Sequence, residues 1–304
     1  MQARYFTADV FTDRRFGGNQ LAVFPDARGV PEDLMLTITR EFNYSETTFV
    51  LPPSDPRNTR RVRIFTPGGE VPFAGHPTVG TAYVLAHAGE VKLQGPETRI
   101  VFEEGVGPVP VTIRARDGVP TYSRLSVAKL PERGPLPPEP GDLARALSLD
   151  EGDLVGGDWA AEVWSCGLPF LFIPLRNRDA VRRARVRLDA WEAELSNFAA
   201  PEMFVFALDP EREGSDIRAR MFAPGLSVPE DPATGSACAA LAGYLAARSP
   251  GTGGPLGWVV EQGFEMGRPS IVEVEAERRN GTVTAVRVGG SSVIVCEGVL
   301  HLDT

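Results

Sequence analysis

An internal repeat constrains the fold of this 304-residue chain more than any other feature of its sequence. Residues 61–72, RVRIFTPGGEVP, align with residues 218–229, RARMFAPGLSVP, at a constant offset. After a small adjustment, HPTVGTA at 76–82 matches DPATGSA at 231–237. Each half is predicted to form a strand, a Pro-Gly turn, and then a His-Pro or Asp-Pro pair that opens a helix. Two matching blocks in the same order indicate an internal duplication.

The helix predicted in each half is apolar on nearly all sides. The first covers Thr78–His87 and ends before Gly89, and the second covers about Thr234–Arg248 and is rich in alanine. A helix without a polar face has to be surrounded by protein. Because short strands flank each helix, the sequence predicts an α+β fold in which a sheet is wrapped around a central apolar helix, twice.

The remaining elements are predicted from periodicity and turn residues. Asn280-Gly281 favours a type I′ turn and therefore a hairpin between the strands on either side of it. The proline-rich stretch Leu130–Gly141 can continue neither a helix nor a central strand, and is interpreted as a connector. Alternating apolar and polar residues predict strands at Arg4–Phe11, Arg61–Thr66, Val109–Ala115, Asp216–Phe222, Ser270–Glu277 and Thr282–Val288. Further helices are predicted at Pro31–Phe42, Asp142–Leu147 and Ala180–Leu195.

Composition excludes several classes of function. The chain carries 40 acidic against 31 basic residues, a net charge of −9, which disfavours a nucleic-acid partner. No stretch approaches the roughly 20 apolar residues of a membrane span, and the first residues lack a signal-peptide pattern, so a cytoplasmic location is expected. Three scattered cysteines and three histidines, without CxxC or HExxH, predict no zinc site and no histidine-built metal site, and leave only a carboxylate-bound magnesium site open. Dinucleotide and P-loop motifs are also missing, so classical dinucleotide and P-loop nucleotide sites are not expected.

The two predicted helix starts point to an anionic substrate. A helix N-terminus presents unpaired N–H groups and a partial positive charge, which suit a carboxylate. Two such ends that face one cleft would bind and polarise a small anionic metabolite. The alternative is a pair of ordinary capped helices, with His76 and Asp231 as N-cap residues.

Several motifs resemble the phenazine-biosynthesis PhzF-like isomerase/epimerase family, whose fold is that of diaminopimelate epimerase. They span nearly the whole chain: DVFT at 9–12, GNQLAVF at 18–24, SETTFV at 45–50, FTPGGEVPFAGHPTVGTA at 65–82, EDPATGSA at 230–237, and QG with GRPS between Gln262 and Ser270. The resemblance implies two pseudo-symmetric lobes, each a curved mixed β-sheet or open barrel around a central apolar helix. They are an N-terminal lobe of residues 1–118 plus about 292–304 and a C-terminal lobe of 119–291, with an active site in the cleft between them. It also implies acid/base chemistry without a cofactor, and a homodimer.

The resemblance places the site residue by residue. Glu46 of the SET motif corresponds to the general acid/base of the family, and His76 of GHPT and Asp231 of EDPATGSA are expected to act with it. A pKa of Glu46 raised by burial, by Asp231 or by closure over substrate would suit this role. The residues expected to bind substrate are Asn19, Ser45, Gly75, Pro77, Gly235 and Ser236.

Two departures narrow the chemistry. Diaminopimelate epimerase uses two opposed cysteines, but Gly75-His76 and Pro232-Ala233 stand in those regions here, and Cys238 is predicted to be a core residue. Gln20 also replaces the proline that many relatives carry after Gly-Asn. The ungapped repeat register places Pro201 opposite Glu46, so the proton chemistry is expected to rest on one lobe.

The expected function is therefore an isomerase that moves a proton within a small carboxylate-bearing metabolite, similar to trans-2,3-dihydro-3-hydroxyanthranilate isomerase. An epimerase or racemase of an unrelated metabolite remains an alternative, because a fold does not determine a substrate. So does a catalytically idle relative that binds a small ligand or a protein. The physiological substrate, the pathway and the oligomeric state do not follow from the sequence.

Overall fold

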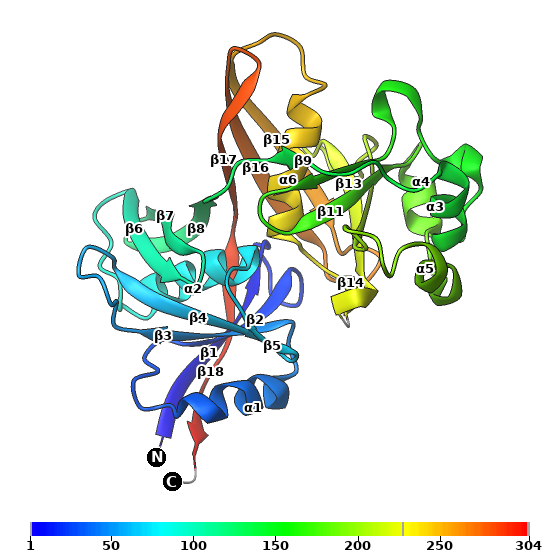
Figure 1. The fold of residues 1–304 in the computed structure, drawn as a ribbon. Helices are drawn as coiled ribbons and strands as arrows, with labels where there is room; N and C mark the ends of the chain where they lie inside the picture. Colours follow the sequence, from blue (N-terminus) through cyan, green and yellow to red (C-terminus); the bar gives the residue numbers. More distant parts are fainter. Residues whose placement is uncertain (1, 227, 303–304) are drawn as a thin grey trace. The chain divides into compact units, whose positions relative to one another are not determined.

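The computed structural model describes residues 2–226 and 228–302, and within these it has a mixed α/β architecture (Figure 1). These residues include eighteen strands, in parallel and antiparallel pairs, and six α-helices. Within them, no helix combines the length and apolar character that crossing a membrane requires. The chain divides into two compact parts, Met1–Ala128 with Val288–Thr304, termed unit 1, and Lys129–Arg287, termed unit 2.

Unit 1 is built on a mixed sheet. Strand β1 pairs antiparallel with β2 and β18, β2 runs parallel to β3, and β4 pairs antiparallel with β3 and β5 and parallel to β6. Strands β6, β7 and β8 form an antiparallel meander. The bounds are β1 Gln2–Val10, β2 Asn19–Phe24, α1 Glu32–Phe42, β3 Glu46–Leu51, β4 Arg60–Thr66, β5 Gly69–Val71, α2 Gly75–His87, β6 Glu97–Glu104, β7 Gly107–Arg116, β8 Val119–Ser126 and β18 Ser292–His301.

The predicted apolar helix of the first half is α2, and it is the centre of unit 1. Every residue from Gly75 to Ala86 is buried, and the helix packs against β1, β2, β3, β7, β8 and β18. Gly80 allows this packing, because a Cβ there would lie 2.5 Å from Val10 Cγ2 and 2.6 Å from Leu21 Cδ2. In contrast, α1 is amphipathic and covers β3 and β4 with one face.

Unit 2 repeats the pairing order of unit 1. Its β10–β11 hairpin, the parallel β11–β12 pair, the antiparallel β12–β13–β14 strands and the parallel β13–β15 pair have direct counterparts in unit 1. The predicted duplication therefore extends to the strand pairing. The bounds are β9 Glu132–Arg133, α3 Pro140–Ala146, β10 Glu162–Ser165, β11 Pro169–Pro174, α4 Arg178–Arg183, α5 Leu188–Glu194, β12 Met203–Ala207, β13 Ile217–Ala223, β14 Val228–Asp231, α6 Gly235–Ala246, β15 Gly254–Gln262, β16 Ser270–Arg279 and β17 Thr282–Gly290, with 3-10 turns at Glu151–Asp153, Gly157–Trp159 and Pro224–Leu226.

Three local predictions differ from the structure. The single helix expected over 180–195 is wrong: α4 and α5 are separate helices, because the N–H groups of Arg185 and Arg187 between them donate to carbonyls at the end of α3. Helix α3 begins at Pro140, inside the segment interpreted as a connector. The compact units also divide after β8 rather than before it, since β8 pairs with β7. By contrast, Asn280 and Gly281 both have positive φ, as the predicted type I′ turn requires.

Candidate active site

Glu46 and His76 lie together in unit 1. Glu46 is the first residue of β3, and His76 is the second residue of α2. Glu46 Oε2 and His76 Nε2 are 3.4 Å apart, and the two side chains are 16% and 5% exposed. This distance is longer than the roughly 2.7–3.2 Å of an ordinary N–H···O hydrogen bond, and catalytic contacts often shorten only when substrate binds. The pair therefore combines a partly accessible carboxylate with a buried imidazole.

A second pair of predicted residues orients the imidazole. The Ser45 hydroxyl donates to Asn19 Oδ1 at 3.2 Å, and Asn19 Nδ2 lies 3.3 Å from His76 Nδ1. Asn19 is the first residue of β2, which runs parallel to β3 with Leu21 opposite Glu46. The parallel pairing thus brings the Asn19 and Glu46 ends of two adjacent strands to the start of α2.

Burial makes His76 a neutral imidazole. It lowers the pKa of His76 to about 3, while a hydrogen bond with the Gln20 backbone acts in the opposite direction. Desolvation disfavours the charged form of a histidine, so the ring carries a single proton at neutral pH. The Glu46–His76 contact is consequently not an ion pair at neutral pH. A neutral ring can instead form a hydrogen bond with the carboxyl group.

The predicted residues of unit 2 gather at the start of α6. Asp231 ends β14, and its carboxylate accepts a hydrogen bond from the Thr234 hydroxyl. The buried Gln262 side chain fixes this turn, because its amide donates to the Asp231 carbonyl and accepts from the Thr234 N–H. Gly235 and Ser236 are the first two residues of α6. Correspondingly, in unit 1 the buried Gly75 and Pro77 flank His76 in the first turn of α2.

The strand pairing corrects the repeat alignment made from the sequence. Ile64 pairs with Val71 in unit 1, and Met221 pairs with Asp231 in unit 2. The β13–β14 hairpin is therefore longer by three residues, since 231 − 221 is 10 and 71 − 64 is 7. His76 consequently corresponds to Ser236, not to Asp231. Each is the second residue of its helix, whose N-cap residue is Ala74 or Thr234, so the N-cap alternative for His76 and Asp231 is wrong.

The same pairing identifies a carboxylate that sequence comparison missed. Thr47 pairs with Phe65 and Met203 pairs with Phe222, so Glu202, rather than Pro201, occupies the position of Glu46 in unit 2. Glu202 is 3% exposed, and burial raises its pKa to about 7. The ungapped register hid it, because the two halves differ in length between these strands.

A second missed carboxylate, Glu104, supports the first turn of α2. It ends β6, is 6% exposed, and accepts a hydrogen bond from the Thr78 hydroxyl at 2.8 Å. Burial raises the pKa of Glu104 to about 8, against the smaller opposing effect of that hydrogen bond. No motif marks Glu104, since a charged residue at the end of a strand is ordinarily exposed.

Cys238 behaves as predicted for a small core residue. It is fully buried inside α6, and burial raises the pKa of its thiol far above the usual range. A thiol with a raised pKa stays protonated at neutral pH and cannot accept a proton, because only the thiolate acts as a base.

Comparisons with known proteins agree over nearly the full length of the chain. A family model described as a phenazine biosynthesis-like protein, PhzC-PhzF, matches residues 8–298. An uncharacterized isomerase from Mesorhizobium japonicum is 40% identical over 307 residues, which are 99% of this chain and 100% of the relative. The trans-2,3-dihydro-3-hydroxyanthranilate isomerase of Pseudomonas aeruginosa is 34% identical over 314 residues, 98% and 99% of the two chains.

A solved structure shows the same fold. The crystal structure of the Bacillus anthracis phenazine biosynthesis protein of the PhzF family matches with a TM-score of 0.88 and 24% identity, and the match covers 99% of this chain and 100% of that one.

Proposed function

Because the chain belongs to the phenazine biosynthesis-like PhzC-PhzF family of isomerases, we propose that Glu46 moves a proton between two carbons of a small carboxylate-bearing metabolite. The proximity of Glu46 and His76, 3.4 Å apart at the start of α2, is the observation that carries this proposal. The proposed chemistry is a double-bond shift with no cofactor in the proton transfer, and the Pseudomonas aeruginosa relative is named as an isomerase of trans-2,3-dihydro-3-hydroxyanthranilate.

The Glu46 carboxylate takes a proton from one carbon and the resulting acid returns a proton to another. His76 assists as a neutral hydrogen-bonding group. If the Ser45 hydroxyl donates to Asn19 Oδ1, the Asn19 amide N–H donates to His76 Nδ1, and the ring proton is then on Nε2, facing Glu46. This tautomer lets His76 stabilise the carboxylate before the proton is taken.

The remaining predicted residues complete the proposal. The N–H groups at the start of α2 suit the carboxylate or the developing enolate oxygen of the substrate. We assign Asp231 to the acid/base machinery of the same reaction. Substrate contacts are assigned to Asn19, Ser45, Gly75, Pro77, Gly235 and Ser236. The homodimer implied by the family is a further part of the proposal and is tested by light scattering.

The test uses solvent exchange. Small cyclic and acyclic carboxylates, including trans-2,3-dihydro-3-hydroxyanthranilate, are first ranked by how far they raise the melting temperature, since a ligand of the native state stabilises it. The best ligands are then incubated in D₂O with wild type and with Glu46→Gln. The variant should lose about 10²-fold or more of the deuterium incorporation, the usual contribution of a general acid/base, while ligand binding persists.

Glu41→Gln is the matched control, because Glu41 is exposed on α1 only a few residues before Glu46. Exchange at the wild-type rate in Glu46→Gln would refute the assignment. Wild type that binds carboxylates but exchanges no proton would support the idle relative instead. A product that differs from the substrate only in configuration would support the epimerase.

A further inference from the structure

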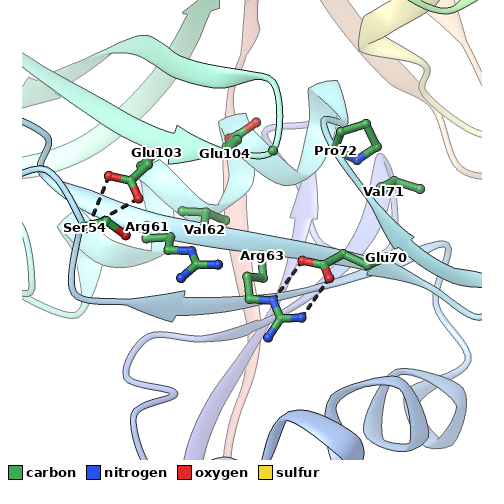
Figure 2. A pocket seen from close by; sticks show the side chains of 10 residues that line it. Ser54, Arg61, Val62, Arg63, Glu70, Val71, Pro72, Glu103 and Glu104 are labelled. Atoms are coloured by element: carbon green, nitrogen blue, oxygen red, sulfur yellow. Dashed lines mark hydrogen bonds and ion pairs between the residues drawn. The ribbon is translucent and has the colours of Figure 1, made fainter.

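Unit 1 contains a groove of about 550 Å³ at the edge formed by β4, β5 and the end of β6 (Figure 2). Arg61 lines the groove, together with Pro72, Glu103 and Gly105 among others. None of Glu46, His76, Asn19 and Ser45 lines this groove, whereas Glu104, which supports the first turn of α2, does. The groove is therefore separate from the residues assigned to proton transfer.

The duplication shows what occupies the matching position in unit 2. Arg61 pairs with Glu103 across β4 and β6, and Arg218 pairs with Glu261 across β13 and β15, so the two arginines correspond. The Arg218 guanidinium lies 4.0 Å from the centre of the Phe264 ring and donates to Glu265 Oε1 at 2.9 Å. An aromatic ring and a carboxylate from the same segment thus cover this arginine.

The length of one turn explains why the groove in unit 1 is open. Gly105 and Gly263 correspond, because a Cβ at either would lie 3.0 Å or less from Cα of the matching Pro72 or Pro232. In unit 1, Glu104 pairs with Gly107, so the turn holds only residues 105 and 106. In unit 2, Gln262 pairs with Ser270, so the turn spans residues 263–269 and includes Phe264 and Glu265.

The residues around the groove leave the Arg61 guanidinium available to bind a ligand. It is exposed and forms no hydrogen bond or ion pair with any residue that the structure describes. The neighbouring Arg63 is held by Glu70 through two hydrogen bonds of 2.7 and 2.8 Å (Figure 2).

Three carboxyl groups line the groove near Arg61, and the first, Glu70, is bound to Arg63, although the charge of Arg61 also helps to lower the pKa of Glu70. Glu103 accepts hydrogen bonds from the N–H groups of Asp55 and Ser54, and these contacts hold its pKa at about 2. Glu104 has a pKa of about 8 and is therefore uncharged at neutral pH. The carboxylate of a ligand can bind Arg61 next to Glu103, because the corresponding Arg218 binds two carboxylates at once, those of Glu261 and Glu265.

We propose that this groove binds a small aromatic carboxylate, with the ring stacked on the Arg61 guanidinium and the carboxylate paired with it. Such a molecule would reproduce the contacts that Phe264 and Glu265 make with Arg218. Stacking on a guanidinium and a charge-assisted hydrogen bond to it are compatible, because they use the face and the edge of the same planar group.

The experiment is an NMR titration of the ¹⁵N-labelled full chain with 3-phenylpropionate. The amide resonances of Gly105 and Val106, and the side-chain resonance of Arg61, should shift and saturate. Neutral 3-phenylpropanamide and acetate should each bind more weakly, because each lacks one of the two contacts. Arg61→Ala should weaken binding of 3-phenylpropionate about tenfold or more, the usual effect of losing a hydrogen bond between charged groups.

Arg99→Ala is the matched control, since Arg99 is exposed on β6 but does not line the groove. Glu46→Gln should bind 3-phenylpropionate in the groove as wild type does, so a failure of the proposed catalysis leaves this test intact. In a second variant, the turn residues 105–106 are replaced by GFEMGRP, the sequence of residues 263–269, which should fill the groove and abolish the binding.

Three results would overturn the proposal. They are an unchanged affinity in Arg61→Ala, an equal affinity for 3-phenylpropanamide, and shifts confined to residues around Glu46.

Discussion

Replacing Glu104 with glutamine should remove the loss of stability that unit 1 otherwise suffers as pH rises. The carboxyl group is buried and its pKa is raised to about 8, so the folded chain keeps the proton that the unfolded chain releases near the ordinary value of 4.5. A raised carboxyl pKa stabilises the fold fully below the unfolded pKa, and this stabilisation is lost as pH rises through the folded pKa. Between pH 5.5 and 7.5 the loss is about 3 kcal/mol, at about 1.4 kcal/mol per pH unit.

Glutamine is the appropriate replacement because unit 2 already carries it. Gln262 corresponds to Glu104 and forms hydrogen bonds with both groups of Thr234 at the start of α6. The glutamine oxygen at position 104 can still accept from the Thr78 hydroxyl. The free energy of unfolding of wild type should therefore fall relative to that of Glu104→Gln as pH rises, while Glu202 and His76 titrate in both proteins and cancel from the difference.

Hydrogen exchange of the α2 amides, followed by mass spectrometry and corrected for the intrinsic exchange rate at each pH, is the assay. Tryptophan fluorescence would miss the effect, because Trp159, Trp164, Trp191 and Trp258 all lie in unit 2. Glu41→Gln serves as the exposed control. The reasoning is wrong if the difference in opening free energy between wild type and Glu104→Gln is the same at pH 5.5 and 7.5.

Two further predictions concern α2. The ¹⁵N resonances of the His76 ring should show a neutral ring, with the proton on Nε2, from pH 8 down to about pH 4, since burial lowers its pKa to about 3. Protonation near pH 6.5, or a proton on Nδ1 bonded to the Gln20 carbonyl, would contradict the proposed orientation. Gly80→Ala should lower the free energy of unfolding by about 2 kcal/mol in urea melts followed by circular dichroism, because the added methyl overpacks α2 against β1 and β2. Gly68→Ala should change it little, since its Cβ would lie 3.5 Å from the nearest atom, and equal effects of the two substitutions would count against the packing argument.

Much of the architecture follows from local patterns in the sequence. The duplication, the two apolar helices and the Asn280-Gly281 turn depend on periodicity and on residues with particular backbone preferences, which act over a few positions. The family motifs point to Glu46 and His76 as site residues, and only the structure shows that the two side chains lie 3.4 Å apart. The broken helix at 184–187 was not foreseeable, because carbonyls from α3, distant in sequence, take the N–H groups of Arg185 and Arg187.

The sequence by itself thus determined that the chain is built twice around an apolar helix and that its motifs are those of this isomerase family. Tertiary structure alone decided which residues correspond, because three additional residues in the β13–β14 hairpin shift the register and pair His76 with Ser236. It also decided which charges are buried. Glu104 and Glu202 look like ordinary surface carboxylates in the sequence, but desolvation inside the folded units raises their pKa values. Burial depends on contacts among strands far apart in the chain, and no local pattern encodes them.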